Sequence, residues 1–200
     1  MTSTVLPGKV DWTGDNPFIY LKTDPEGNWS SLSLFFRITA SVHGAGHLTL
    51  VVTDPYDAEQ ASALGLTDNE TLARFLIENF AAKFVLFRPT GALKDITLHT
   101  SAEFTKEVTE DTWTETAKDT VSGVEVVMRW DRLQTSFAVH QPAAESGTGR
   151  HEMLSVFLPA DSGTVMVDGT ALPGATVERD FFGGRAQSAA MALSETWVQA

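Results

Sequence analysis

The sequence predicts a mainly β protein, folded as a single antiparallel β-barrel or sandwich with one amphipathic helix. In several segments apolar and polar residues alternate with a period of two, and the longest such run extends from Trp29 to Val42. Turn signals divide these segments, among them the Pro and Gly of residues 24–27 and the dipeptide Asp168-Gly169. Clear helical periodicity is confined to one stretch, at about residues 68–83. The 200 residues therefore suit one β-rich domain that spans residues 1–200.

Composition and charge narrow the classes of function. With 42% hydrophobic and 20% charged residues, the chain has the composition of a globular protein. Its net charge is −12 and its Lys and Arg residues are scattered singly, so we expect neither nucleic acid nor an anionic membrane as a partner. The absence of cysteine excludes thiol nucleophiles, disulfides and cysteine-ligated metals. The first residues lack the pattern of a signal peptide, so we expect a cytoplasmic protein, and a homodimer stays open.

The first part of the chain predicts three strands. Residues 16–22 have the pattern of a short strand, residues 29–42 of the longest strand, and residues 47–53 of its hairpin partner across the loop His43–His47. The two glycines of this loop oppose a helix, so its histidines lack the helical setting of an HxxxH metal site. Alternation gives the longest strand one mixed face, typical of a pocket wall or of a half-exposed sheet: Trp29, Ser31, Ser33, Phe35 and Arg37.

Helical structure is expected between these strands and the Thr-rich part of the chain. A turn and a short helix are predicted over residues 54–66. A longer helix follows at about residues 68–83, where Thr67 and Glu70 have the spacing of a capping box. Its apolar residues recur at helical spacing, so we expect it to pack against the sheet or to plug one end of a barrel. Residues 85–87 are expected to form a short strand.

The second half predicts a succession of strands. Thr-rich segments interleaved with acidic residues favour strands with one solvated face. Asp168-Gly169 is the strongest short hairpin signal, and residues 178–185, which contain two adjacent glycines, have the pattern of a loop. Residues 186–198 are expected to form a closing strand, which the ending ETWV favours, although Ala and Met also permit a helix there. The other strands expected here cover residues 95–100, 102–108, 112–117, 121–131, 136–140, 151–159, 163–167 and 170–172.

This succession of about nine to eleven strands with one clear helix resembles lipocalin-like (calycin) barrels in architecture only, without a family fingerprint. The common cofactor and nucleophile motifs are missing, since no P-loop, GxGxxG, HExxH, GxSxG or EF-hand pattern occurs. A metal site is disfavoured because His140, His151 and Glu152 are the only close set, and Glu152 would point away from His151 on a strand. We therefore expect no cofactor and no metal.

Acid–base chemistry remains, and its candidates lie around the Gly/Ser turn of the second half. His140 ends one expected strand and His151 begins the next, so antiparallel pairing could bring the two imidazoles together for proton transfer. Arg150, beside His151, could hold a carboxylate or an enolate. Glu195 is an alternative base if burial raises its pKa. Exposed histidines at a turn, beside a solvated ion pair, are an equally good interpretation.

Aromatic and Met side chains at strand positions could line an apolar cavity. Arg37, on the mixed face of the longest strand, would be a second clamp for an anion. Ordinary core packing explains the same tryptophans equally well. The residues that we expect at a ligand are Trp29, Phe35, Arg37, Trp113, Met128, Trp130, Met153 and Trp197.

The leading hypothesis is a protein that binds a small, largely apolar organic molecule in a barrel cavity. Cofactor-free acid–base catalysis, of an isomerase, cyclase, hydratase or dehydratase type, would accompany binding if the His or Glu candidates meet the ligand. A non-catalytic carrier with the same cavity is the first alternative. The second is an interaction or assembly module that presents the loop Phe181–Gly184 and an exposed strand.

Overall fold

One large mixed β-sheet is the frame of the molecule. The computed structural model describes residues 5–199. Hydrogen bonds order the strands as β6-β5-β4-β3-β1-β15-β11-β9-β8-β7, and β2, β10 and β12 pair alongside this path. These strands are β1 (Lys9–Asp15), β2 (Phe18–Leu21), β3 (Ser31–Ser41), β4 (Gly46–Thr53), β5 (Ser62–Thr67), β6 (Thr97–His99), β7 (Ala102–Val108), β8 (Thr112–Asp119), β9 (Glu125–Leu133), β10 (Phe137–Gln141), β11 (His151–Val167), β12 (Thr170–Ala171) and β15 (Ala189–Gln199). A separate hairpin consists of β13 (Glu178–Phe181) and β14 (Gly184–Gln187).

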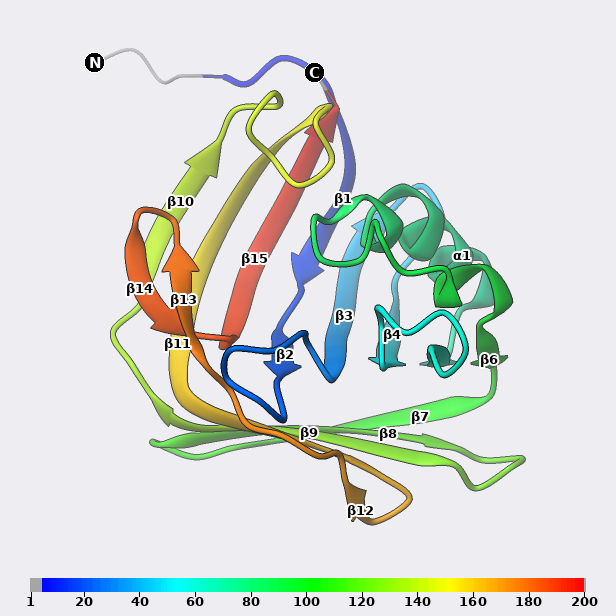
Figure 1. Cartoon of the computed structure of the whole chain (residues 1–200). Coiled ribbons are helices and arrows are strands. Elements are labelled where there is room, and N and C mark those ends of the chain that lie inside the picture. The colour runs from blue at the N-terminus through cyan, green and yellow to red at the C-terminus, as the bar shows by residue number, and fades with distance from the viewer. Residues whose placement is uncertain (1–4, 200) are drawn as a thin grey trace.

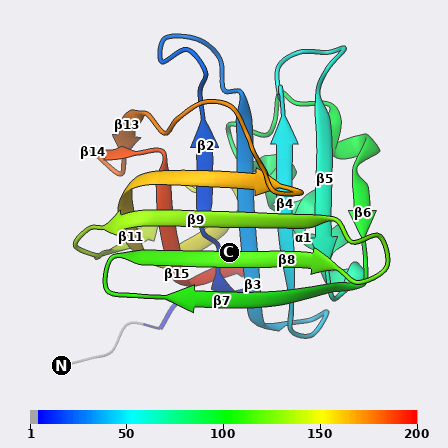
Figure 2. The ribbon, with the colours of Figure 1, turned by 90° about the horizontal axis from the view of Figure 1, so that it is seen from below.

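Strand β11 divides the large sheet into two halves. It pairs with β10 and β15 up to Pro159, and it pairs with β9 from Ala160 onward. We call the two parts the β15 half, which holds β1–β6, β10 and β15, and the β9 half, which holds β7, β8, β9 and β12. Strand β11 curves from one half into the other (Figure 1), and β7, β8 and β9 run across the strands of the β15 half (Figure 2).

Two apolar cores result from this arrangement. The inter-sheet core lies between the two halves, and the helix-side core lies on the opposite face of the β15 half, beneath α1 (Glu70–Asn79) and the segments that follow it. Strand β3 contributes to both cores because its side chains alternate. Leu32, Leu34 and Phe36 belong to the helix-side core, whereas Phe35 belongs to the inter-sheet core with Ile19, Met128 and Trp130.

The helical segment is shorter than its sequence pattern predicts. The α-helix ends at Asn79 and a 3₁₀ turn over Ala81–Lys83 follows, so the expectation of one continuous helix to residue 83 is wrong. The capping residue is Asn69, whose side-chain oxygen accepts a hydrogen bond from the Leu72 N–H at 3.1 Å. Thr67 does not cap the helix, because it ends β5 and its hydroxyl donates to the His47 carbonyl at 2.6 Å. A second 3₁₀ turn covers Ala92–Asp95.

Other segments also differ from expectation. The predicted short helix at 54–66 is wrong at its end, where residues 62–67 form β5 and pair with β4. The segment expected as a loop over 178–185 is the β13–β14 hairpin, and its turn residues Phe182 and Gly183 both have positive φ. No strand forms over residues 85–87, which lie in turns.

The prediction of a mainly β chain with one α-helix is confirmed. The hairpin at Asp168-Gly169 is also confirmed, since both residues have the positive φ of a tight turn and Val167 pairs with Thr170. The strand order ends at β6 and β7, and no pairing between these two closes it among residues 5–199. In the same range, none of the helices has the length and apolar character needed to cross a bilayer.

Candidate functional site

A pocket opens on the helix-side face of the β15 half, and we call it the Glu195 pocket. Strands β11 and β15 form its floor, β2 forms one wall, and the segment 84–86 and the β13–β14 hairpin form its rim. Its volume is about 280 Å³, just below the roughly 300–1,000 Å³ of typical small-molecule sites, so it suits only a small ligand. Its lining includes Asn16, Phe18, Tyr20, Leu34, Phe84, Leu86, Gln141, Glu145, Met153, Phe157, Arg179, Phe181, Phe182, Ala192, Glu195 and Trp197.

A β-bulge in β15 turns Glu195 into this pocket. Ala192 faces the helix-side core, so strict alternation would point Ser194 toward that core and Glu195 away from it. The register against β11 shifts beside Ser194, which adopts a left-handed φ of 51°. Asp15 holds the bulge, since its Oδ1 accepts a hydrogen bond from the Ser194 N–H at 3.0 Å. The extra residue reverses the alternation, and Glu195 and Trp197 therefore line the pocket.

The Glu195 carboxyl is buried and held by two donors. Trp197 Nε1 donates to Oε1 at 2.6 Å, and Asn16 Nδ2 donates to the same oxygen at 3.1 Å. Burial raises the pKa of Glu195 to about 7, although these two hydrogen bonds favour the ionised form. Near neutral pH the carboxyl is therefore present both as an acid and as a base, which is the property that proton transfer requires.

Aromatic rings form most of the remaining wall. The Phe84 ring stacks on the Trp197 indole, with centroids 5.8 Å apart. Phe181, from the hairpin, meets Phe157 edge-on at 5.0 Å and Phe18 at 5.8 Å. These rings give the pocket an apolar, low-dielectric interior, which explains why the carboxyl on its floor binds a proton so strongly.

Polar side chains also line the pocket at the Tyr20 end of the β2 wall. Tyr20 follows Phe18 on the same face of β2, and the two rings stack with centroids 4.8 Å apart. The guanidinium of Arg179 lies over the Tyr20 ring, 5.8 Å from its centroid. Burial raises the pKa of Tyr20, so its hydroxyl stays protonated and is a hydrogen-bond donor. Glu145 reaches the same pocket from the loop between β10 and β11 and is exposed.

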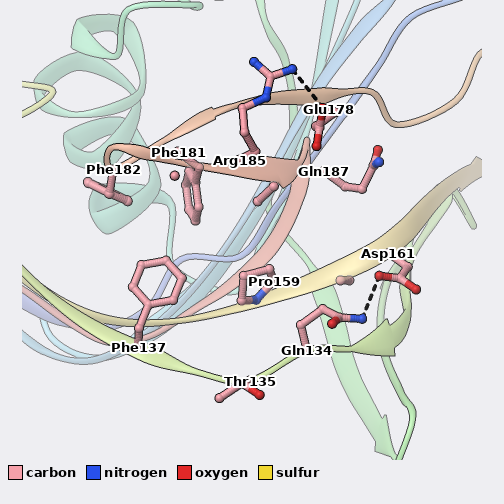
Figure 3. A pocket seen from close by; sticks show the side chains of 13 residues that line it. Gln134, Thr135, Phe137, Pro159, Asp161, Glu178, Phe181, Phe182, Arg185 and Gln187 are labelled. Atoms are coloured by element: carbon pink, nitrogen blue, oxygen red, sulfur yellow. Dashed lines mark hydrogen bonds and ion pairs between the residues drawn. The ribbon is translucent and has the colours of Figure 1, made fainter.

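A second hollow of about 620 Å³, the hairpin groove, lies between the β13–β14 hairpin and the bend of β11 (Figure 3). Its polar side chains bind one another: Gln134 Nε2 donates to Asp161 Oδ1 at 2.6 Å, and Arg185 Nη2 contacts Glu178 Oε2 at 2.9 Å. Phe181 lines both hollows. We therefore place the candidate site in the smaller Glu195 pocket, where a group with a shifted pKa lines an apolar wall.

The structure does not bring His140 and His151 together. His140 pairs opposite Leu154 and its Nε2 contacts Glu152 Oε2 at 2.8 Å, on the face of β11 that points away from the pocket. His151 is fully buried on the other face. Its Nε2 contacts Asp11 Oδ2 at 2.9 Å and its Nδ1 contacts Thr148 Oγ1 at 2.8 Å, so both nitrogens are engaged. Burial lowers the pKa of His151, and the residue ties the loop before β11 to β1.

The two arginines that were candidate anion clamps have protein partners. Arg37 makes a bidentate pair with Glu115, at 2.8 Å and 2.6 Å, between β3 and β8. Arg150 is exposed and donates to Asn79 Oδ1 at 3.2 Å. Trp113 also contacts the Arg37–Glu115 pair, because its Nε1 donates to Glu115 Oε1 at 2.7 Å.

The other candidate ligand residues divide between the pocket and the cores. Met153 and Trp197 line the Glu195 pocket. Trp29 is partly buried at the helix-side core, beside Tyr20. The mixed face of β3 is covered by the β9 half and is not a pocket wall there. Phe35, Met128 and Trp130 are fully buried in the inter-sheet core.

Several pocket residues had no signal in the sequence. Asn16 and Tyr20 belong to a segment that reads as an ordinary short strand, and Arg179 lies in a stretch that reads as a loop. The only available signal was Glu195 two residues before Trp197, in a strand rich in apolar residues. Strict alternation places these two residues on one face. The bulge that directs this face into the pocket has no sequence signature here.

Comparison of the chain with models of protein families, with curated proteins and with solved structures finds no match. Within residues 5–199, no three or more His, Asp or Glu side chains are grouped so that they could hold a metal ion.

Proposed function

We propose that the protein binds a small, largely apolar organic molecule in the Glu195 pocket, and that Glu195 exchanges a proton with it. The observation that carries the proposal is a buried carboxyl with a pKa of about 7 on the floor of an apolar pocket. The proposal does not depend on a lipocalin-like barrel, because the pocket lies beneath the hairpin and the segment 84–86 and not inside a barrel. The net charge of −12 argues against nucleic acid as the ligand.

Glu195 suits proton transfer better than either histidine does. Trp197 and Asn16 both donate to Oε1, so the proton of the neutral acid resides on Oε2. No described residue makes a hydrogen bond to Oε2, which leaves this oxygen for a ligand. The class of reaction that fits is cofactor-free isomerisation, cyclisation, hydration or dehydration, in which one group adds or removes a proton. A carrier that uses Glu195 only as a hydrogen-bond donor is the alternative.

Binding can be tested through the Trp197 indole N–H, which contacts Glu195 directly. The five indole N–H signals of the ¹⁵N-labelled chain are recorded by NMR, and the Trp197 signal is assigned with Trp197→Phe. A panel of one-ring and two-ring aromatic fragments is then titrated. We expect saturable shifts of the Trp197 signal, because a fragment in the pocket lies against this indole.

A matched pair of variants locates the binding. Ala192 lines the Glu195 pocket and Ala186 lines the hairpin groove, so Ala192→Leu fills the first hollow and Ala186→Leu fills the second. Ala192→Leu should abolish the shifts and Ala186→Leu should preserve them. Fragments that bind equally to both variants, or a panel in which nothing shifts the Trp197 signal, would overturn the proposal.

A further inference from the structure

Arg179 of β13 is the one Lys or Arg among the described residues that line the Glu195 pocket. The side chain is half-buried, and in the described part of the chain no carboxylate lies within ion-pair distance of it. Its Nε donates to the Asp180 carbonyl at 3.3 Å. The neighbouring carboxylates of Glu178 and Asp180 are both paired with Arg185, at 2.9 Å and 3.4 Å. The Nη groups of Arg179 are therefore a fork of donors that an anion in the pocket can use.

The Tyr20 hydroxyl is a second free donor in the same pocket. Tyr20 is only 7% exposed and lines the Glu195 pocket. Its hydroxyl makes no hydrogen bond to a described residue, yet it is not one of the unpaired atoms that are sealed from solvent, so it reaches the pocket. Burial raises the pKa of Tyr20, and the hydroxyl therefore keeps its proton. Buried polar groups are almost always paired in folded proteins, so this hydroxyl indicates a place where a ligand atom binds.

The two donors lie together at one end of the β2 wall, with aromatic rings beside them. The Arg179 guanidinium lies over the Tyr20 ring, 5.8 Å from its centroid. The Phe18 ring stacks on the other side chain of this pair, Tyr20, with centroids 4.8 Å apart. Phe181, two residues after Arg179 on β13, meets Phe18 at 5.8 Å. A ligand that places an anionic group at these donors therefore needs an apolar body next to it.

The donors suit a single negative charge. A planar carboxylate accepts two parallel hydrogen bonds from a guanidinium and keeps lone pairs for a hydroxyl. A doubly charged phosphate fits less well, because the other charged groups of the lining are the acids Glu145 and Glu195. Glu145 is exposed, so it can turn toward solvent when a carboxylate enters.

We propose that the ligand of the Glu195 pocket is a small aromatic monocarboxylic acid, with its carboxylate at Arg179 and Tyr20 and its ring over Phe18. The volume of about 280 Å³ suits one ring with a short chain. Phe18 stands between Tyr20 and Asn16, the residue that donates to Glu195, so the ring and not the carboxylate would face Glu195. This inference rests on the proposed function and adds the class of ligand to it.

Three probes that share a phenyl ring on a three-carbon chain, but differ in charge, test the inference. They are 3-phenylpropanoate, the neutral 3-phenylpropanamide and the cationic 3-phenylpropan-1-aminium. The ¹⁵N-labelled full-length chain is titrated with each probe at pH 6, where the probe carboxylate is ionised and Glu195 is mostly protonated, and the Trp197 indole signal is followed. We expect the carboxylate to bind at least about tenfold more tightly than the amide, and the cation to bind most weakly.

Three variants assign the preference for the carboxylate over the amide to its donors. Arg179→Gln should remove this preference. Arg185→Gln is the matched control, because it removes a positive charge from the same hairpin without lining the Glu195 pocket, and it should keep the preference. Tyr20→Phe keeps the ring beneath the guanidinium and should reduce the preference by about fivefold. Each comparison is between two probes on one variant, so a uniform change in affinity cancels.

Several results would overturn the inference. Equal Kd for the carboxylate and the amide on the wild-type chain would show that the pocket does not select a negative charge, and tightest binding by the cation would show that its acids dominate. A preference that survives Arg179→Gln, or that Arg185→Gln removes equally, would show that Arg179 does not bind the carboxylate. An unchanged preference in Tyr20→Phe would exclude Tyr20 from the site.

Failure of the inference differs from failure of the proposed function. If uncharged fragments shift the Trp197 signal and the carboxylate does not, the apolar pocket stands and this ligand class is excluded. If no fragment of any kind shifts that signal, the proposed function fails together with the inference.

Discussion

Glu195 shows how one residue obtains its chemistry from a local defect in a strand. Alternation in β15 would place its carboxylate on the opposite face from Ala192, and the bulge at Ser194 reverses this. At the bulge Ser194 adopts a left-handed backbone conformation, which non-glycine residues rarely adopt outside constrained sites. Burial then raises the pKa of Glu195 to about 7. Proton transfer by Glu195 near neutral pH depends on this raised pKa.

The raised pKa predicts how stability changes with pH. Between pH 4.5, the ordinary pKa of the group, and about 7 the folded chain binds a proton that the unfolded chain releases, so stability falls as pH rises through this range. Glu195→Gln keeps the acceptor for Asn16 and Trp197 but cannot ionise. We expect this variant to gain about 3 kcal/mol over the wild type between pH 4.5 and pH 8. Urea denaturation at a series of pH values measures the difference.

The same titration has a direct spectroscopic signature. The Trp197 indole N–H signal of the wild type should move with an apparent pKa near 7, because the indole donates to the titrating carboxyl. Glu195→Gln should remove this inflection, while His140→Gln, on the opposite face of β11, serves as the control and should preserve it. A wild-type signal that titrates below pH 5 would show that the carboxyl is solvated.

At the scale of elements, the β13–β14 hairpin covers the pocket without joining the large sheet. Ring contacts hold its turn against the large sheet, since Phe181 packs against Phe157 at 5.0 Å and against Phe18 at 5.8 Å. Phe181 lines both the Glu195 pocket and the hairpin groove, and Figure 3 shows it on the hairpin side of the groove. The hairpin therefore decides whether the pocket is closed on this side.

Removal of this wall should affect stability and ligand binding together. Phe181→Ala deletes a side chain that is only 9% exposed, so we expect a loss of about 3 kcal/mol in the free energy of unfolding. Fragments that bind in the Glu195 pocket should lose at least tenfold in affinity, because the pocket and the groove would merge. Phe137→Ala is the control, since Phe137 lines the hairpin groove but not the Glu195 pocket and is 37% exposed, so its removal should leave fragment affinity in the Glu195 pocket unchanged and cost about 1 kcal/mol. Similar losses for the two variants would contradict this account of the hairpin.

The elements also differ in how well the sequence predicts them. The strands at 102–108 and 112–119 and the hairpin at Asp168-Gly169 follow from alternation and turn chemistry, which are local signals. Strand β5 escaped prediction because its sequence, SALGLT, has no strong local preference and its partner β4 decides its conformation. The Glu195 pocket was harder to predict than β5, because it forms only where β2, β15 and the hairpin meet and only with the bulge at Ser194. Met153, Glu195 and Trp197 were named from sequence and line it, but nothing local linked them to Asn16, Tyr20 or Arg179.

At the scale of the whole molecule, the two halves of the sheet are joined by β11 and by the contacts of the inter-sheet core. One of these contacts is ionic: Arg37 of β3 makes a bidentate pair with Glu115 of β8, whose side chain is fully buried. Trp113 Nε1 supports the pair by donating to Glu115 at 2.7 Å. The face of β3 that the alternation pattern marks as mixed is therefore a contact between halves, which the sequence of one strand cannot reveal.

This pair predicts a non-additive effect of substitutions. Arg37→Met removes the partner of a buried carboxylate, so we expect the free energy of unfolding to fall by about 3 kcal/mol. Arg37→Met combined with Glu115→Leu replaces both charges by apolar side chains of similar size, and this double variant should recover most of the loss. Arg129→Met, at an exposed ion pair with Asp131, is the control and should cost about 1 kcal/mol or less. Urea denaturation of the four chains measures these differences. If the double variant is as unstable as Arg37→Met alone, the carboxylate is not the source of the loss, and apolar packing by the Arg37 side chain holds the halves together instead.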